Sequence, residues 1–167
     1  MNKLILVLLA TAMAAVAQPA KVSGELTVDG KATKLTHVYA YLTQGFFDKE
    51  KNDTVVLLTN GPLTEAQFRD EMTLRKLARD GKLCFVKESI NDLGQIVNYT
   101  VGHGDFRMSP SGASTDHVFE GKADGKTISG KVLTKVTQKS MDAHKYTYSA
   151  TFTASILPRE KPAPNKK

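Results

Sequence analysis

Histidines are the residues of this chain that most directly suggest chemistry, because imidazole binds metals and moves protons near neutral pH. His37 lies in a strand-like segment in phase with Leu35, His103 begins a long loop, and His117 opens a later segment. No two of the four histidines have the close spacing of a zinc or copper motif. A metal site would therefore have to be assembled by folding, and its candidate ligands are His37, His103, Asp105 and His117.

The string VGHGDF at 101–106 is the motif that most resembles part of an enzyme. It places an imidazole between two glycines beside Asp105, and Ser109, Ser111 and Ser114 follow it. A Ser-His-Asp hydrolase also needs an orienting geometry and an oxyanion hole, and the chain has no G-x-S-x-G motif. Turn formation by glycine and serine is the simpler interpretation, and a hydrolase remains an alternative.

Acidic residues give no clear signal of glycoside hydrolysis. Glu88, Asp92, Asp116 and Glu120 lie in or beside strand-like segments, where we expect them on the solvent-facing side. The chain has no tryptophan that could form a platform for a sugar ring.

Aromatic residues are the candidates for ligand binding. They cluster in two strand-like segments and are Tyr39, Tyr41, Tyr146, Tyr148 and Phe152. If the first and last strands close a barrel, these side chains would share its lumen, which in small barrels either is filled by side chains or holds one small ligand. Core filling and an apolar ligand site are therefore both open.

Strands must position most of these residues. The segment KYTYSATFTASIL at 145–157 alternates apolar and hydroxyl-bearing residues, which predicts a strand with one buried face. Asp-Gly pairs at 29–30 and 124–125 predict tight turns of antiparallel hairpins. The predicted strands lie near 22–28, 33–42, 53–59, 82–90, 95–102, 115–122, 127–136 and 145–156.

One helix is predicted in the segment 61–83. Thr64 and Gln67 have the spacing of a capping box, Glu71 and Arg75 that of an i,i+4 ion pair, and Gly81 suits the end of the helix. The fold class is therefore mainly β with one helix (α+β). We expect an antiparallel eight-stranded barrel or strongly curved sheet with the helix over one side or end, and a two-sheet sandwich is the alternative.

The first residues predict export. Residues 1–17 have a lysine, an apolar run and an A-x-A end, which is typical of a cleaved bacterial signal peptide, and no stop-transfer pattern follows. Residues 18–157 are then a single β-rich domain, and residues 158–167 a disordered basic, Pro-rich tail. The formal net charge is +6, but much of it lies in that tail, which argues against a nucleic-acid surface.

Together these features predict a periplasmic or secreted binding or protein-interaction module without catalytic activity. A metal-binding protein or hydrolase that uses the His37, His103, Asp105 and His117 set is one alternative, and an inhibitor or immunity partner of a cell-envelope enzyme is another. We expect a monomer without a transmembrane segment after signal cleavage, whose partner is a small apolar ligand or an envelope protein. The residues do not indicate a particular cofactor.

Overall fold

The alternating segment near the end of the chain forms the longest strand, β11 (Lys145–Leu157), in the computed structural model, which describes residues 20–160. The predicted signal peptide and residues 161–167 of the predicted tail lie outside the described residues. Apolar residues of β11 alternate with its hydroxyl-bearing ones, and the buried ones are Tyr146, Tyr148, Ala150, Phe152 and Ala154. The predicted strand with one buried face is therefore confirmed.

β11 is the central strand of the first of two arms of the sheet. It pairs antiparallel with β1 on one side and with β9 on the other. In spatial order this arm consists of β2 (Lys31–Lys34), β1 (Lys21–Val28), β11, β9 (Thr127–Thr134) and β8 (His117–Ala123), with β10 (Gln138–Lys139) beside the start of β11.

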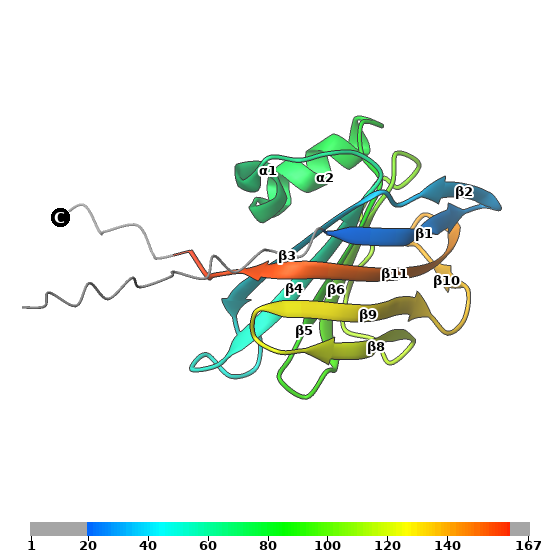
Figure 1. Ribbon diagram of the computed structural model, residues 1–167. Helices are drawn as coiled ribbons and strands as arrows, with labels where there is room; N and C mark the ends of the chain where they lie inside the picture. Colours follow the sequence, from blue (N-terminus) through cyan, green and yellow to red (C-terminus); the bar gives the residue numbers. More distant parts are fainter. Residues whose placement is uncertain (1–19, 161–167) are drawn as a thin grey trace, which may run out of the picture.

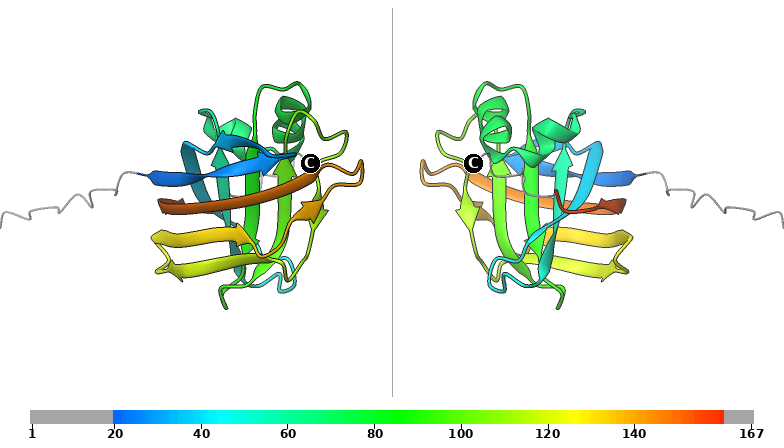
Figure 2. Two further views of the ribbon diagram at one scale, coloured as in Figure 1. Left: turned by 90° about the vertical axis from the view of Figure 1, so that its right-hand side faces the viewer. Right: turned by 90° about the vertical axis from the view of Figure 1, so that its left-hand side faces the viewer.

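The second arm is joined to the first through the end of β11. Ile156 and Leu157 pair in parallel with Ala40 and Tyr41 of β3, and antiparallel pairs continue the sheet from there. This arm consists of β3 (His37–Gln44), β4 (Asn52–Thr59), β5 (Phe85–Ile90), β6 (Ile96–Gly102) and β7 (Ser111–Gly112). The strands of the two arms run across each other (Figure 2). The result is one open, curled sheet that forms a half-barrel (Figure 1), which confirms the predicted curved sheet.

Both Asp-Gly turns are present, but the first hairpin is shorter than expected. Asp29 and Gly30 have φ values of 46° and 80°, the left-handed conformation that such a turn needs. Beyond β2, the Leu35 N–H donates to Gly24 of β1, whereas the Thr36 N–H donates to Thr59 of β4. The chain therefore changes arms at these two residues, and the single strand predicted over 33–42 is divided into β2 and β3.

The predicted helix is divided as well, into α1 (Glu65–Arg69) and α2 (Glu71–Arg79). The capping box at Thr64 and Gln67 is confirmed. Asp70 has an extended backbone, ends α1, and accepts a hydrogen bond from the Met72 N–H at the start of α2. One side chain thus caps a second helix in the middle of the predicted one.

The helices cover the outer face of the second arm (Figure 1), where Phe68 and Leu74 pack on Tyr41, Leu57 and Phe85. The inner core lies between the arms and includes alternate residues of their strands. This arrangement explains why residues 55–58 of β4 are all apolar, since Val55 and Leu57 face the helices while Val56 and Leu58 face the inner core.

Glu71 of α2 fastens the helix layer to the sheet. Its carboxylate forms ion pairs with Lys87 of β5 and, as predicted, with Arg75 one turn further along α2. Burial tends to raise the pKa of Glu71, but hydrogen bonds from Lys87 and Arg75 outweigh it and hold this pKa below its usual value. Within residues 20–160, neither helix has the length and apolar character needed to span a bilayer.

Candidate functional site

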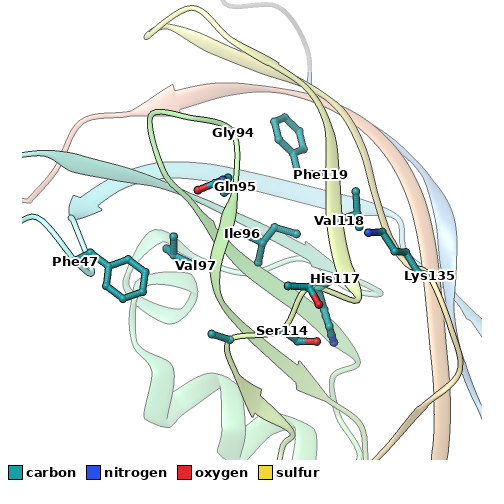
Figure 3. Close-up of a pocket in the computed structure, with 12 residues that line it drawn as sticks. Phe47, Gly94, Gln95, Ile96, Val97, Ser114, His117, Val118, Phe119 and Lys135 are labelled. Atoms are coloured by element: carbon teal, nitrogen blue, oxygen red, sulfur yellow. The ribbon is translucent and has the colours of Figure 1, made fainter.

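A cavity of about 820 Å³ lies between β6 of the second arm and β8 of the first, two strands that are not hydrogen-bonded to each other. We call it the seam cavity. Its lining residues are Phe47, Gly94, Gln95, Ile96, Val97, Ala113, Ser114, Thr115, His117, Val118, Phe119 and Lys135. Figure 3 shows Ile96, Val97 and Phe47 on one side, Val118, Phe119 and Lys135 on the other, and His117 with Ser114 at one end.

Phe119 forms part of the apolar wall because two neighbouring positions have no side chain. A Cβ atom at Gly121 would lie 2.6 Å from the Phe119 ring, and one at Gly130 would lie 2.8 Å from it. These distances are shorter than a normal carbon–carbon contact, so the ring can lie over the β8–β9 hairpin only if both residues are glycine. The ring also contacts Phe152 of β11, with centroids 6.1 Å apart.

Phe47 lies at the rim of the seam cavity on the loop between β3 and β4. The loop is held by Asp53, whose carboxylate accepts a hydrogen bond of 2.7 Å from the Phe46 N–H. A 2.7 Å ion pair between Lys51 and Asp92 ties it to the turn between β5 and β6. Phe47 is nevertheless 75% exposed, and its neighbour Phe46 is 53% exposed, so two adjacent aromatic side chains reach solvent.

A buried polar chain ends at the wall of this cavity. Tyr148 of β11 donates a short hydrogen bond to Oε1 of Glu88 on β5. The hydroxyl oxygen of Tyr148 also lies 2.6 Å from Nδ1 of His117 at the start of β8. The His117 ring stacks on Tyr99 of β6, with centroids 3.6 Å apart. We call Glu88, Tyr148 and His117 the buried triad, and its members come from both arms of the sheet.

Burial makes the acid and the base of the buried triad neutral at pH 7. Desolvation raises the pKa of Glu88 to about 8, although the hydrogen bond from Tyr148 acts in the opposite direction, and no cationic partner of Glu88 is found among the described residues. Desolvation lowers the pKa of His117 to about 4, since an imidazolium would lose its hydration. Burial, and then the charge of Glu88, raises the pKa of Tyr148 well above its ordinary value.

Two atoms of the triad lack a hydrogen-bond partner. In the part of the chain that the structure describes, Oε2 of Glu88 and Nε2 of His117 are the buried side-chain polar atoms without one. Glu88 is 1% exposed and His117 is 3% exposed. Unpaired buried polar groups are unfavourable in a folded protein, so an unpaired atom of His117, a residue that lines the cavity, points to a role.

The expectation that Glu88 faces solvent is wrong. Val86, Glu88 and Ile90 lie on the same face of β5, and all three point into the inner core. The sequence did contain the signal, because VKESI places the glutamate in phase with two apolar β-branched residues. What it could not show is that Tyr148, distant in the chain, donates to this carboxyl group and also contacts His117.

The aromatic residues predicted to bind a ligand do not share one lumen. Tyr146, Tyr148 and Phe152 lie in the inner core, and Tyr148 belongs to the buried triad. Tyr39 and Tyr41 lie on the opposite face of the sheet, where both stack on Phe68 of α1 with centroids 4.6 Å and 5.6 Å apart.

The residues predicted to bind a metal are also distributed over the fold. His117 is in the buried triad, and His37 contacts Thr36 at the start of β3. His103 and Asp105 do lie together, with Nδ1 and Oδ2 3.5 Å apart, in the loop after β6. Over residues 20–160, no group of three or more histidine, cysteine or acidic side chains has an arrangement that could hold a metal ion.

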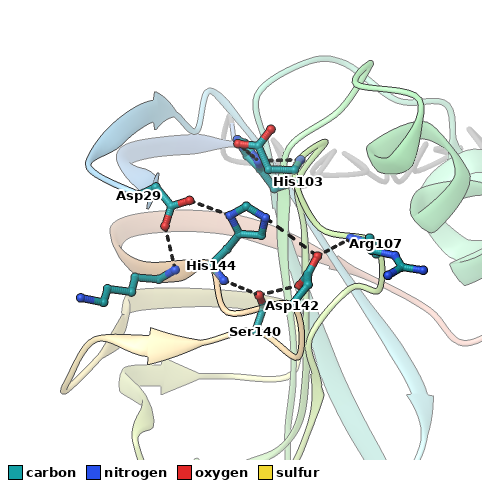
Figure 4. A network of polar contacts seen from close by, with 8 residues as sticks. Asp29, His103, Arg107, Ser140, Asp142 and His144 are labelled. Atoms are coloured by element: carbon teal, nitrogen blue, oxygen red, sulfur yellow. Dashed lines mark hydrogen bonds and ion pairs between the residues drawn. The ribbon is translucent and has the colours of Figure 1, made fainter.

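A second polar cluster joins the turns at one end of the sheet (Figure 4). His144 lies between Asp29, at 2.6 Å, and Asp142, at 3.9 Å. Asp142 also accepts hydrogen bonds from the Arg107 N–H and the Ser140 hydroxyl. The hydrogen bond with Asp29 raises the pKa of His144, and the same bond lowers the pKa of Asp29. Because the cluster connects three loops, we interpret it as structural.

Comparison with protein-family models, with curated protein sequences and with solved structures finds no match for this chain. Its function must therefore be inferred from the seam cavity and the buried triad.

Proposed function

We propose that this protein is a binding module that takes up one small, mostly apolar ligand in the seam cavity. The observation that carries the proposal is the cavity itself, about 820 Å³ in volume and walled by Ile96, Val97, Val118 and Phe119. Cavities of roughly 300–1,000 Å³ with apolar walls and a few polar groups are typical of small-molecule sites.

The rim of the cavity supports a ligand that is apolar over most of its length. Phe47 is exposed although its loop is held in place, and a bound ligand would cover part of its ring. Lys135 also lines the cavity and is exposed, so the entrance can tolerate a polar or anionic end. Deeper inside, His117 supplies the polar contact that would orient the molecule.

We further propose that binding occurs without catalysis and outside the cytoplasm, in the periplasm or the medium. The location is supported by the sequence of residues 1–17, which has the features of a cleaved signal. Binding without catalysis is supported by the position of the triad, whose polar groups are engaged with one another in the protein core.

Binding of the neutral fluorescent dye N-phenyl-1-naphthylamine tests the proposal. Its emission rises when it enters an apolar site. Ser114→Trp places a large side chain at one end of the cavity, so we expect it to weaken dye binding at least tenfold. Met72→Trp adds the same side chain to an exposed site on α2 and should leave binding unchanged.

The proposal fails if the wild-type protein does not bind the dye, or if both tryptophan variants bind it as tightly as the wild type. Melting temperatures of both variants must stay close to that of the wild type for the comparison to be valid. Native mass spectrometry of protein released without denaturant adds an independent test, because a mass above that of the bare chain would reveal a ligand acquired in the cell.

A further inference from the structure

We propose that the seam cavity selects ligands that carry an uncharged hydrogen-bond donor, such as a hydroxyl or N–H group, and that Nε2 of His117 accepts this hydrogen bond. The inference rests on the proposed function and adds a rule of recognition to it. The rule follows from the direction of the hydrogen bonds in the buried triad.

Tyr148 is the donor to Glu88. It requires the proton of neutral Glu88 to lie on Oε2, the oxygen without a partner in residues 20–160, so that Oε1 is a carbonyl oxygen that can only accept; a proton on Oε1 would reverse the donors and leave the imidazole hydrogen on Nε2. The single hydroxyl hydrogen of Tyr148 is thereby used. The contact of 2.6 Å between the Tyr148 oxygen and Nδ1 of His117 then needs a hydrogen from the imidazole.

The hydrogen on Nδ1 determines the protonation of the other ring nitrogen, Nε2. A neutral imidazole carries one hydrogen, so Nε2 has a lone pair and can only accept. Stacking on Tyr99 and the bond to Tyr148 hold the ring in this orientation. His117 therefore lines the cavity, and its Nε2 is a fixed, buried acceptor that finds no partner within residues 20–160.

Ligands differ in what they can offer this acceptor. An alcohol, a phenol or an amide N–H can donate to it and satisfy a buried polar atom, which makes binding more favourable. An ether or a carboxylate presents a lone pair to another lone pair. A carboxylate would also bring a negative charge into the apolar interior near Glu88, so its favourable position is at the entrance beside Lys135.

Three naphthalene probes separate these cases: 1-naphthol, 1-methoxynaphthalene and 1-naphthoate. We expect the wild-type protein to bind 1-naphthol about tenfold more tightly than the methyl ether, since one hydrogen bond distinguishes them. Isothermal titration calorimetry at neutral pH gives the dissociation constants. Nitrogen-15 NMR of the labelled protein identifies which ring nitrogen of His117 carries the hydrogen.

His117→Phe keeps a flat ring against Tyr99 and removes the acceptor, so 1-naphthol should lose its advantage while the methyl ether binds as before. Tyr148→Phe is the second variant, because it removes the group that holds the hydrogen on Nδ1, and the preference for 1-naphthol should decrease. His37→Phe is the matched control outside the cavity and should retain the full preference.

Each outcome decides between the proposals. Equal binding of 1-naphthol and its methyl ether, with both weakened by Ser114→Trp, overturns the donor rule and leaves the proposed function standing. A hydrogen on Nε2, or preferential binding of 1-naphthoate, also overturns the rule. If neither the three probes nor N-phenyl-1-naphthylamine binds, the proposed function and the rule fail together.

Discussion

Glu88→Gln should make the protein more resistant to alkaline pH. In the fold the pKa of Glu88 is about 8, against 4.5 for an ordinary glutamate. The folded state therefore holds a proton that the unfolded chain has released between these values, and stability declines as pH rises through them. At about 1.4 kcal/mol for each pH unit, the decline from Glu88 alone totals about 5 kcal/mol.

His117 opposes this decline over part of the range. Its pKa is about 4 in the fold and 6.5 ordinarily, so between these values the unfolded chain binds the additional proton and stability rises with pH. The two effects nearly cancel between pH 4.5 and pH 6.5. From pH 6.5 to pH 8 only the Glu88 effect remains, and we expect it to be about 2 kcal/mol.

Urea unfolding followed by circular dichroism at pH 6.5 and pH 8 measures this effect. The Glu88→Gln variant keeps a carbonyl oxygen for Tyr148 and cannot ionise, so its stability relative to the wild type should increase by about 2 kcal/mol between the two pH values. Other titrating groups are common to both proteins and cancel in the difference. Glu120→Gln, at an exposed position of β8, is the control. A constant difference between wild type and Glu88→Gln would refute the idea of a neutral buried acid.

Three further predictions concern the scaffold. Thr64→Ala removes the N-cap of α1 and should lower the free energy of unfolding by about 1 kcal/mol in urea titrations. Gly102→Ala would place a Cβ atom 2.0 Å from Cε1 of Phe85, so we expect a loss of about 1–3 kcal/mol, visible as a lower melting temperature; an unchanged value would contradict the packing described. Asp29→Asn should lower the pKa of His144 in an NMR titration, because the hydrogen bond from Asp29 is what raises it. The ion pair of the wild-type protein stabilises the fold while Asp29 is ionised and His144 is protonated. As the pH falls below the ordinary pKa of Asp29, this stabilisation decreases. It also decreases as the pH rises through the raised pKa of folded His144.

Local patterns predicted most of the strands and both Asp-Gly turns. Alternation in 145–157 and the residue pair at 29–30 depend on neighbours in sequence, and such signals are visible in one chain. The break between β2 and β3 was missed, because it depends on Leu35 and Thr36 bonding to strands of different arms. No residue at that point, such as proline or glycine, marks the change in the sequence.

The division of the helix was missed for a related reason. Asp70 fits the middle of a helix in a count of i,i+4 spacings, but its carboxylate also accepts hydrogen bonds from Met72 and Thr73, and this caps a new helix. A short polar side chain can compete in this way with the helical backbone. Sequence alone does not decide which of the two arrangements is the more stable.

The candidate site was predicted least well. His117 was identified as a residue of interest, but as a metal ligand, and Tyr148 was identified as one of five aromatic residues in a common lumen. Tyr148 contacts both His117 and Glu88, which lie 31 and 60 positions from it in the chain. Such contacts arise from the curl of the sheet, which no local pattern specifies.

The place of β11 in both arms has a consequence for how the protein is made. This strand follows all the others in residues 20–160, yet β1, β9 and β10 pair with it along their length, and β3 pairs with its end. A chain emerging from a ribosome can pair strands β3 to β7 of the second arm early, but it cannot complete the first arm until residues 145–157 are free. Pairings between segments so distant are slow to form, because a long loop must close first. The first arm would thus form after the second, once the end of the described chain has been synthesised.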